Sequence, residues 1–213
     1  MSIIVENKVA LVTGANRGIG KSIVESFIKH GAKKVYLAVR DLDSTKELED
    51  KYGNKVATVK ADLSNTESIE HLAQQTTDVE IVVNNAGIGN PQVTIGKEVE
   101  KELQKQLDVN VFGFLRVANT FAKTLEKNKG ALVQMNSVAS LKNFPHLSIY
   151  SASKAASYSL TQGLREDLKD KGGRQFHIMG YDHHGPPFGG QILDDFDDFL
   201  LKLGVQRRGR FVE

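Results

Sequence analysis

The stretch KVALVTGANRGIG, residues 8–20, joins a short apolar run to three glycines and then to an amphipathic helix. Glycines allow a tight turn and let a phosphate approach the backbone, while a helix start offers free N–H groups. A glycine-rich turn in isolation is more often only structural, but between a buried strand and a helix it predicts dinucleotide binding. The expected contact residues are Gly14, Asn16, Arg17, Gly18, Ile19 and Gly20.

Apolar runs recur along the chain and alternate with longer amphipathic segments. Within the runs the apolar residues stand together rather than alternating with polar ones, which is typical of strands buried on both faces. This pattern predicts an α/β fold with a parallel sheet and crossover helices. The expected strands are residues 8–14, 33–39, 55–62, 80–87 and 131–137, and the longest expected helices are about 97–128 and 148–171.

Two helix starts carry more detailed expectations. After the glycine turn, the helical spacing places Ile19, Ile23, Val24, Phe27 and Ile28 on one apolar stripe, and Gly31 ends the helix. A second helix is expected to open near residue 65, where Ser64 and Glu67 are spaced as a capping box.

Composition excludes several classes of protein. The 213 residues include 28 basic and 26 acidic ones, too balanced for a nucleic-acid or anionic-membrane partner. The absence of cysteine rules out disulfides and thiol catalysis. No leader peptide or apolar run of membrane length is recognisable, so we expect a cytoplasmic protein. The length of the chain favours one domain over residues 1–213. We expect no metal site, and read His177, His183 and His184 as ordinary loop histidines.

The end of the second strand is where a dinucleotide-binding sheet meets the adenosine ribose. An acidic residue there accepts hydrogen bonds from a 2′-hydroxyl, whereas an arginine accommodates a 2′-phosphate. Val39 stands where the acid would be and Arg40 follows it, with Arg17 as a second cation in the glycine turn. This favours NADP(H) over NAD(H). The alternative is that Arg40 only pairs with Asp41 or Asp43.

Polar residues follow the third and fourth strands. Asp62 is placed to reach an adenine amino group, or it is only a turn aspartate, and Leu63 beside it is expected to contact the cofactor. The sequence NNAG, residues 84–87, is expected to bond neighbouring strands and shape the turn under the cofactor, with Asn85, Ala86 and Gly87 in contact with it.

Three further polar features lie downstream. Asn110 interrupts the apolar helical stretch LDVNVFGFLRV, where a buried amide needs a partner, and it either caps a kink or serves a functional role. Ser137 ends the fifth strand, and Tyr150 precedes Lys154 by four residues at the next helix start. A Tyr/Lys pair at this spacing is usually solvent-facing. Here strand ends and helix starts meet on one edge of the sheet, so we expect these side chains to converge on a site there.

Together these motifs resemble the classical short-chain dehydrogenase/reductase family over about residues 7–172. The match rests on TGANRGIG, Asp62, NNAG, NVFG, Ser137 and YSASK. The resemblance implies a Rossmann-type, doubly wound sheet in three αβα layers and hydride transfer between a nicotinamide cofactor and a small carbonyl or alcohol. It further implies that Tyr150 is the general acid/base and that Lys154 lowers its pKa and holds the nicotinamide ribose, so that both residues contact the cofactor. By the same resemblance, Ser137 orients the carbonyl and Asn110 positions a water in a proton relay through Lys154.

The segment after Gly173 departs from the family pattern. The family usually presents a Pro-Gly pair and a threonine there, whereas this chain reads IMGYDHHGPPFGGQ, then an expected short acidic helix, and ends early. The alternative function is therefore a catalytically weak or silent NADP(H)-binding protein. A strand is expected at 175–181.

Self-association is also expected. The helices near 97–129 and 148–171 carry apolar residues, among them Leu103, Leu107, Val111 and Phe114, that exceed what one sheet face covers. Paired helices of this kind form a two-fold interface in the family, so a homodimer or homotetramer is predicted.

Overall fold

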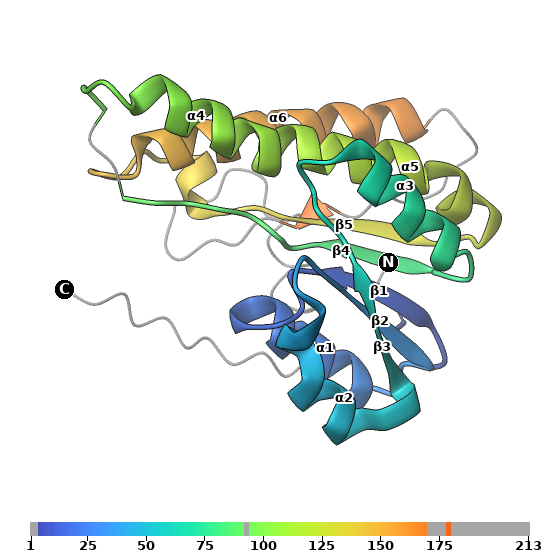
Figure 1. Cartoon of the computed structure of the whole chain (residues 1–213). Helices are drawn as coiled ribbons and strands as arrows, with labels where there is room; N and C mark the ends of the chain where they lie inside the picture. Colours follow the sequence, from blue (N-terminus) through green and yellow to red (C-terminus); the bar gives the residue numbers. More distant parts are fainter. Residues whose placement is uncertain (1–3, 92–93, 170–177, 180–213) are drawn as a thin grey trace.

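The computed structural model describes residues 4–91, 94–169 and 178–179. Within them lies one six-stranded parallel sheet, in the order β3-β2-β1-β4-β5-β6 (Figure 1). The order reverses between β1 and β4, as in a doubly wound fold, so the predicted Rossmann-type architecture is confirmed. The strands are β1 (Val9–Thr13), β2 (Lys34–Val39), β3 (Val56–Lys60), β4 (Ile81–Asn84), β5 (Ala131–Met135) and β6 (Ile178–Met179).

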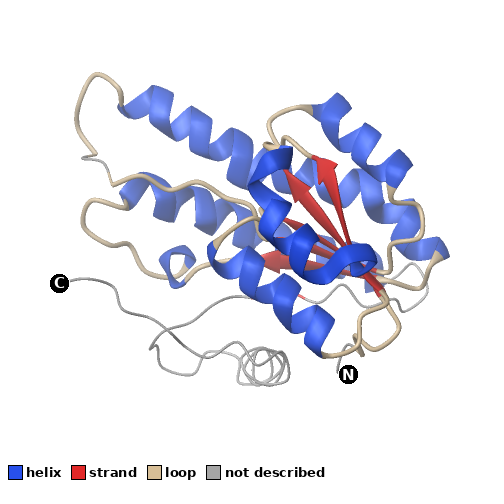
Figure 2. Cartoon of the chain, turned by 60° about the horizontal axis from the view of Figure 1, so that its bottom comes forward, coloured by secondary structure: helices blue, strands red, loops and turns tan. Residues whose placement is uncertain are grey.

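Helices cover both faces of this sheet, and in Figure 2 the strands lie inside a shell of helices. One face carries α1 (Gly18–Lys29) and α2 (Lys46–Tyr52). The opposite face carries α3 (Thr66–Gln75), α4 (Val99–Leu107), α5 (Gly113–Lys127) and α6 (Ser148–Lys169). No helix in the described part of the chain is long and apolar enough to cross a bilayer.

The core consists of two apolar clusters, one on each face of the sheet. Successive residues of a strand point to opposite faces. Ala10 and Val12 of β1 therefore join the cluster under α1, whereas Val9 and Leu11 join the cluster under α3 and α5. All four side chains are buried. This double burial explains why the apolar residues of the strands stand together in the sequence.

Three strands end earlier than predicted. β3 stops at Lys60, β4 at Asn84 and β5 at Met135, two to three residues short of the expected ends. At the end of β4 the backbone N–H groups of Asn85 and Ala86 donate to the Thr13 hydroxyl at 3.0 and 2.9 Å instead of continuing the ladder. The polar residues after the strands are consequently free to form the loops at the carboxyl edge.

Two predictions about helix starts were wrong: the place of Ile19 in the apolar stripe of α1, and the capping box at α3. Ile19 is 51% exposed and does not belong to the buried stripe of α1, because it lies in the first turn beyond the edge of the sheet. The capping box is also displaced: Asn65 caps α3 by accepting from Ser68 N, while the Ser64 hydroxyl donates to Asp62 at 2.7 Å.

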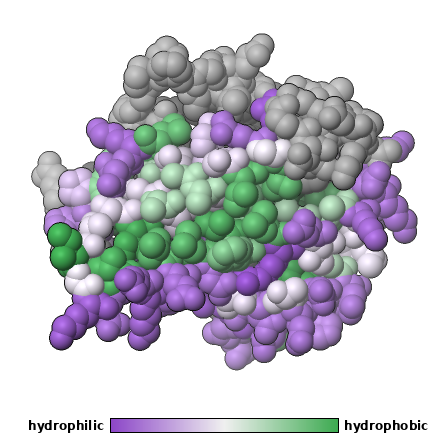
Figure 3. Space-filling view, turned by 90° about the horizontal axis from the view of Figure 1, so that it is seen from above, coloured by the Kyte–Doolittle hydropathy of each residue, from purple (hydrophilic) through white to green (hydrophobic). Residues whose placement is uncertain are grey.

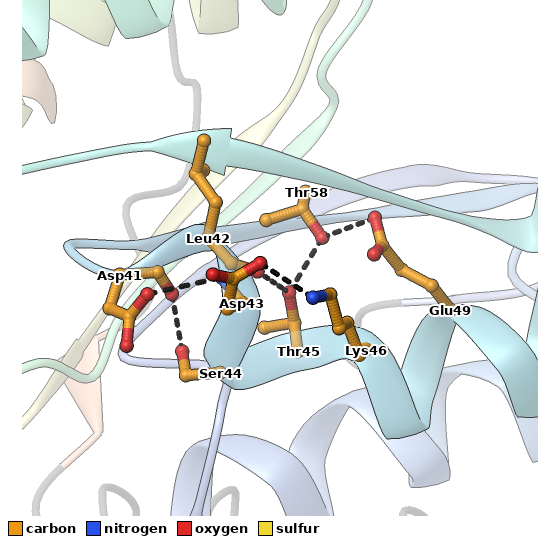
Figure 4. Close-up of polar contacts among 8 residues, drawn as sticks. All are labelled: Asp41, Leu42, Asp43, Ser44, Thr45, Lys46, Glu49 and Thr58. Atoms are coloured by element: carbon orange, nitrogen blue, oxygen red, sulfur yellow. Dashed lines mark hydrogen bonds and ion pairs between the residues drawn. The ribbon is translucent and has the colours of Figure 1, made fainter.

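The helix α2 was not predicted, because Leu48 is its only buried residue and its pattern is dominated by charge. Its position depends on a polar contact with the sheet (Figure 4). The Thr58 hydroxyl of β3 donates to Glu49 at 2.6 Å and lies 2.7 Å from the hydroxyl of Thr45, which is fully buried.

The predicted helix over 97–128 forms in three parts. α4 leads into a π-helical turn, Asp108–Phe112, which continues into α5. The expected irregularity near Asn110 is thus present. The acidic helix after residue 191 and the rest of the tail lie outside the described residues, as does the predicted 175–181 strand apart from β6, and the single domain stays a prediction.

Candidate active site

The glycine turn packs directly against the turn after β4. Gly14 has φ +66°, and a Cβ there would lie 3.2 Å from Ala86. A Cβ on Gly20 would collide with the Gly14 carbonyl oxygen and approach Asn85 Nδ2 to 2.7 Å. Only glycine fits at Gly20, because the first turn of α1 lies against the turn that it leaves. In dinucleotide-binding folds, glycines at such a turn let the backbone approach the pyrophosphate.

The N-terminus of α1 fits an anionic group. Arg17 occupies the N-cap position without a side-chain capping hydrogen bond, and the first turn contains no acidic residue. The first N–H groups of a helix have no intrahelical acceptor, and they carry the positive end of the helix dipole. With Gly18 at φ +53° and Asn16 beside it, this turn has the donor set that a dinucleotide pyrophosphate requires.

The two asparagines of NNAG connect three strands. The Thr13 hydroxyl donates to Asn84 Oδ1 at 3.2 Å, and Asn84 Nδ2 donates to Gln134 Oε1 at 2.7 Å. Asn85 Nδ2 donates to the Thr13 carbonyl at 3.0 Å. These bonds tie β1, β4 and β5 together at their carboxyl ends, which is the structural role expected for this motif.

At the end of β2 each of the two loop aspartates is engaged, one with a backbone N–H group and the other with a lysine. Asp41 accepts from Asp43 N at 3.1 Å, and Asp43 pairs with Lys46 at 2.9 Å (Figure 4). Arg40 is exposed and belongs to none of the salt bridges found within the described residues. The alternative in which Arg40 only pairs with Asp41 or Asp43 is therefore not found.

Asp62 forms a turn with Ser64. Its Oδ1 accepts from Ser64 N at 3.0 Å and from the Ser64 hydroxyl at 2.7 Å. These hydrogen bonds, with smaller contributions from the positive charges of Arg40 and Arg116, hold the pKa of Asp62 below its ordinary value. The neighbouring Leu63 is buried, and its carbonyl accepts from Arg116 at 2.8 Å. The turn role of Asp62 is thus present, and the contact with an adenine amino group stays a prediction.

Asn110 sits in the π-helical turn and clamps the loop after β4. Its Oδ1 accepts from Ile88 N at 2.9 Å, and its Nδ2 donates to the Ile88 carbonyl at 2.8 Å. The second Nδ2 proton goes to Ser153 Oγ at 2.9 Å. Both amide protons are therefore used, and a buried polar side chain is satisfied.

Lys154 is buried beside this clamp. The residue is 5% exposed, and Nζ donates to the Met135 carbonyl at 3.0 Å. A Cβ on Gly87 would lie 3.5 Å from Nζ, so the NNAG turn reaches the same point. Burial, which penalises the charged ammonium, lowers the pKa of Lys154 to about 8.

Tyr150 lies one helical turn before Lys154, whose Nζ is 5.8 Å from the centre of the phenol ring. Burial raises the pKa of Tyr150 above its ordinary value, and the Ser137 side chain acts in the opposite direction. Lys154 adds no resolved contribution to these two effects, so the expected lowering of the Tyr150 pKa by Lys154 stays a prediction. Ser137 Oγ meanwhile accepts from Ala139 N at 3.1 Å.

The carboxyl edge of the sheet thus brings together the glycine turn, NNAG, Asn110, Tyr150 and Lys154. Sequence reasoning missed Ser153, which is fully buried, accepts from Asn110 and donates to the Tyr150 carbonyl at 2.8 Å. Ser153 directly precedes Lys154 in α6, but a serine at a helix start has no distinctive local pattern, so no sequence signal marked it. Contacts between neighbours thus link these segments along the edge, and the roles of the individual residues stay predictions.

Comparison with known proteins identifies the class. Residues 8–179 match the family model described as short chain dehydrogenase, so this chain belongs to the short-chain dehydrogenase/reductase family. Members of the family are oxidoreductases that bind a nicotinamide cofactor, act on small molecules and generally form oligomers.

Two curated relatives illustrate its range. A diacetyl reductase, (S)-acetoin forming, from Staphylococcus epidermidis is 34% identical over 179 residues, covering 78% of this chain and 67% of that protein. Glycine betaine reductase ATRR from Emericella nidulans is 34% identical over 214 residues, covering 89% of this chain but only 17% of the relative. The chain thus spans a small part of one relative and about two thirds of the other.

Two solved structures share the fold. A short-chain dehydrogenase from Burkholderia cenocepacia in complex with NADP has a TM-score of 0.76 at 30% identity, over 84% of this chain and 72% of that one. A short-chain dehydrogenase/reductase from Burkholderia phymatum in complex with NAD has a TM-score of 0.76 at 25% identity, over 97% and 83%.

Proposed function

We propose that this protein is an NADP(H)-dependent oxidoreductase that reduces an aldehyde or ketone to an alcohol, or catalyses the reverse reaction. The observation that carries the proposal is the buried cluster in which Lys154 lies beside the Asn110–Ser153 pair, one turn from Tyr150, at the cofactor edge of the sheet. The relationship to a diacetyl reductase supports a small carbonyl substrate.

Each side chain of the cluster has a chemical task in this proposal. When bound, the nicotinamide cofactor supplies the hydride for reduction or accepts it in the reverse direction. Tyr150 donates its phenolic proton to the carbonyl oxygen as negative charge develops there. Ser137 donates a hydrogen bond to the same oxygen, and Lys154 stabilises the resulting phenolate.

Asn110 acts differently from a simple amide donor. Because both of its amide protons are used by Ile88 and Ser153, its part in a proton relay falls to Oδ1 or to the main-chain carbonyl within the π-helical turn. Such turns interrupt the regular helical hydrogen bonding and often mark functional sites. A water held there would return the proton to Tyr150 through Lys154.

Preference for NADP(H) is supported by the charges at the adenosine end. Arg40 and Arg17 are both exposed, and the aspartates nearest Arg40 in the chain are engaged elsewhere. A guanidinium binds phosphate oxygens through paired hydrogen bonds. Both cofactors occur among structural relatives, so parallel titrations with NADPH and NADH provide the test.

The decisive experiment compares Tyr150→Phe with Tyr158→Phe, two turns further along α6. Nicotinamide fluorescence measures NADPH binding, and consumption of NADPH with a panel of small carbonyls measures turnover. The proposal expects Tyr150→Phe to abolish turnover while NADPH still binds, and Tyr158→Phe to behave as wild type. Wild-type turnover by Tyr150→Phe would refute the assignment.

A wild-type protein that binds NADPH but turns over no member of a broad panel would favour the alternative function, a silent NADP(H)-binding protein. The unusual sequence after Gly173 motivates this alternative.

We also propose that the protein self-associates through the layer formed by α4, α5 and α6. Figure 3 looks down on this layer and shows a continuous band of hydrophobic side chains across it. Phe112, between α4 and α5, is 51% exposed, and Leu103 and Leu107 are partly exposed. Val111 and Phe114, expected from the sequence to face a partner, instead belong to the buried core. Light scattering at micromolar concentration should give a multiple of the single-chain mass.

A further inference from the structure

Gly89 lies against the ring of Tyr150. A Cβ placed on Gly89 would approach Cδ2 of that ring to 2.6 Å, Cε2 to 2.9 Å and Cγ to 3.0 Å. Three ring atoms at such distances mean that the backbone of the loop covers one side of the phenol. Cγ and Cδ2 lie at the end of the ring that is attached to the Cβ atom of Tyr150, so they cannot move aside unless the whole Tyr150 side chain rotates.

The conformation of Gly89 is one that other residues can adopt, because its φ lies outside the left-handed range in which glycine is favoured. Backbone strain therefore does not explain a glycine here. The contact with the Tyr150 ring is the feature that a larger residue would violate.

The loop that carries Gly89 is itself held firmly on one side. Ile88 exchanges two hydrogen bonds with the Asn110 side chain, at 2.9 and 2.8 Å. Asn110 in turn binds Ser153, whose hydroxyl donates to the Tyr150 carbonyl at 2.8 Å. The loop and the tyrosine backbone are thus fixed to the same amide, and the ring fills the space between them.

We propose that Gly89 is a positioning residue for Tyr150: its bare backbone, fixed through Ile88 to Asn110, holds one side of the phenol ring and sets the direction of the hydroxyl. The proposal rests on the role of Tyr150 in the proposed function. Its geometric part, the contact itself, stands independently of any turnover.

Gly89→Ala tests the contact, and Gly96→Ala is the matched control. Gly96 lies in the same connection between β4 and α4, but a Cβ there would meet only Val99 Cγ2 at 3.8 Å. A displacement of about 1 Å in a catalytic group can lower a rate on the order of a hundredfold. We expect Gly89→Ala to lower kcat by about ten- to a hundredfold with little change in NADPH affinity, and Gly96→Ala to change neither.

A readout without turnover distinguishes failure of this proposal from failure of the proposed function. The absorbance of phenolate gives the titration of Tyr150 as the difference between each protein and its Tyr150→Phe counterpart. Because burial raises the pKa of Tyr150, displacement of the ring into water should lower its titration midpoint in Gly89→Ala. An unchanged midpoint would overturn the proposal, whether or not the wild type reduces a carbonyl.

A double-mutant cycle, measured as the change in Tm, keeps the proposal testable if Gly89→Ala folds poorly. If the added methyl group collides with the ring, Gly89→Ala should lower Tm in the wild type but leave Tm unchanged in a Tyr150→Ala background. Residues in direct contact show such coupling, whereas distant residues show additive effects. An equal loss of Tm in both backgrounds would show that the ring is not what Gly89 accommodates, and would overturn the proposal.

Discussion

Asn110 and Ser153 are joined by a hydrogen bond of 2.9 Å from Nδ2 to Oγ, although 43 residues separate them in the chain. The bond connects the π-helical turn with α6 between Tyr150 and Lys154. Asn110 also binds both backbone groups of Ile88. One amide therefore links the loop after β4, the π-helical turn between α4 and α5, and α6.

Replacing this amide should destabilise the protein. Asn110→Leu keeps the approximate volume but leaves the N–H and C=O of Ile88 without their partner. Both groups are part-buried, and an unsatisfied buried group costs about 1–3 kcal/mol, so the free energy of unfolding should fall by about 2–4 kcal/mol in denaturant titrations. Asn54→Leu, at an exposed position before β3, serves as control. Equal stabilities of the two variants would contradict the clamp.

Gly20→Ala should disturb both folding and cofactor binding. The added Cβ would collide with the Gly14 carbonyl, so the glycine turn and α1 must separate. We expect a lower Tm and loss of NADPH binding by fluorescence. Gly163→Ala is the counterpart in α6, where a Cβ meets nothing within 4 Å. It should stabilise the helix by up to about 1 kcal/mol. Normal NADPH binding by Gly20→Ala would contradict the predicted phosphate turn.

Arg40→Ala should weaken NADPH binding selectively. Hydrogen bonds to charged groups contribute about 1.5–3 kcal/mol, which corresponds to a loss of roughly ten- to a hundredfold in affinity. NADH, which lacks the 2′-phosphate, should bind the variant and the wild type alike. Arg165→Ala, an exposed position on α6, controls for the change in net charge. Parallel loss of affinity for both cofactors would show that Arg40 does not distinguish them.

Ser137→Ala should lower turnover without lowering cofactor affinity. Removing one donor to the developing negative charge typically reduces kcat by about a hundred- to a thousandfold. Steady-state kinetics on the best carbonyl of the panel, together with NADPH titration, separate these effects. Ser159→Ala, exposed on the same layer in α6, should retain full activity. A normal kcat for Ser137→Ala would remove Ser137 from the mechanism.

Lys154 should make stability depend on pH in a defined window. Its folded-state pKa of about 8 lies below the ordinary value of 10.5, so between these values the unfolded chain binds more protons. The free energy of unfolding of the wild type therefore rises with pH through that window. Below about pH 8 the buried ammonium is charged, and its full destabilising effect is present.

The uncharged variant Lys154→Met measures this effect. The free energy of unfolding of Lys154→Met minus that of wild type should decrease as pH rises from about 8 to 10.5. Lys55→Met, at an exposed position, should show a difference that varies much less over the same range. A constant difference for Lys154→Met would mean that the ammonium is not desolvated.

The sequence by itself determined the fold class and the edge on which the site lies. Uninterrupted apolar runs require strands buried on both faces, and the glycines of residues 14–20 require a close turn into a helix. Strand ends and helix starts share one edge in such a sheet, so the positions of Ser137, Tyr150 and Lys154 followed from order alone. Their roles came from the family resemblance, and the experiments above test them.

Only the tertiary structure decided the contacts across that edge. Ser153 and Gly89 carry no distinctive local pattern, and their partners are remote in the chain. The burial of Lys154 and the raised pKa of Tyr150 depend on desolvation by several elements together, which no spacing encodes. Likewise Val111 and Phe114 turned inward and Ile19 outward, because packing against the sheet, and not helical periodicity alone, selects the buried side of a helix.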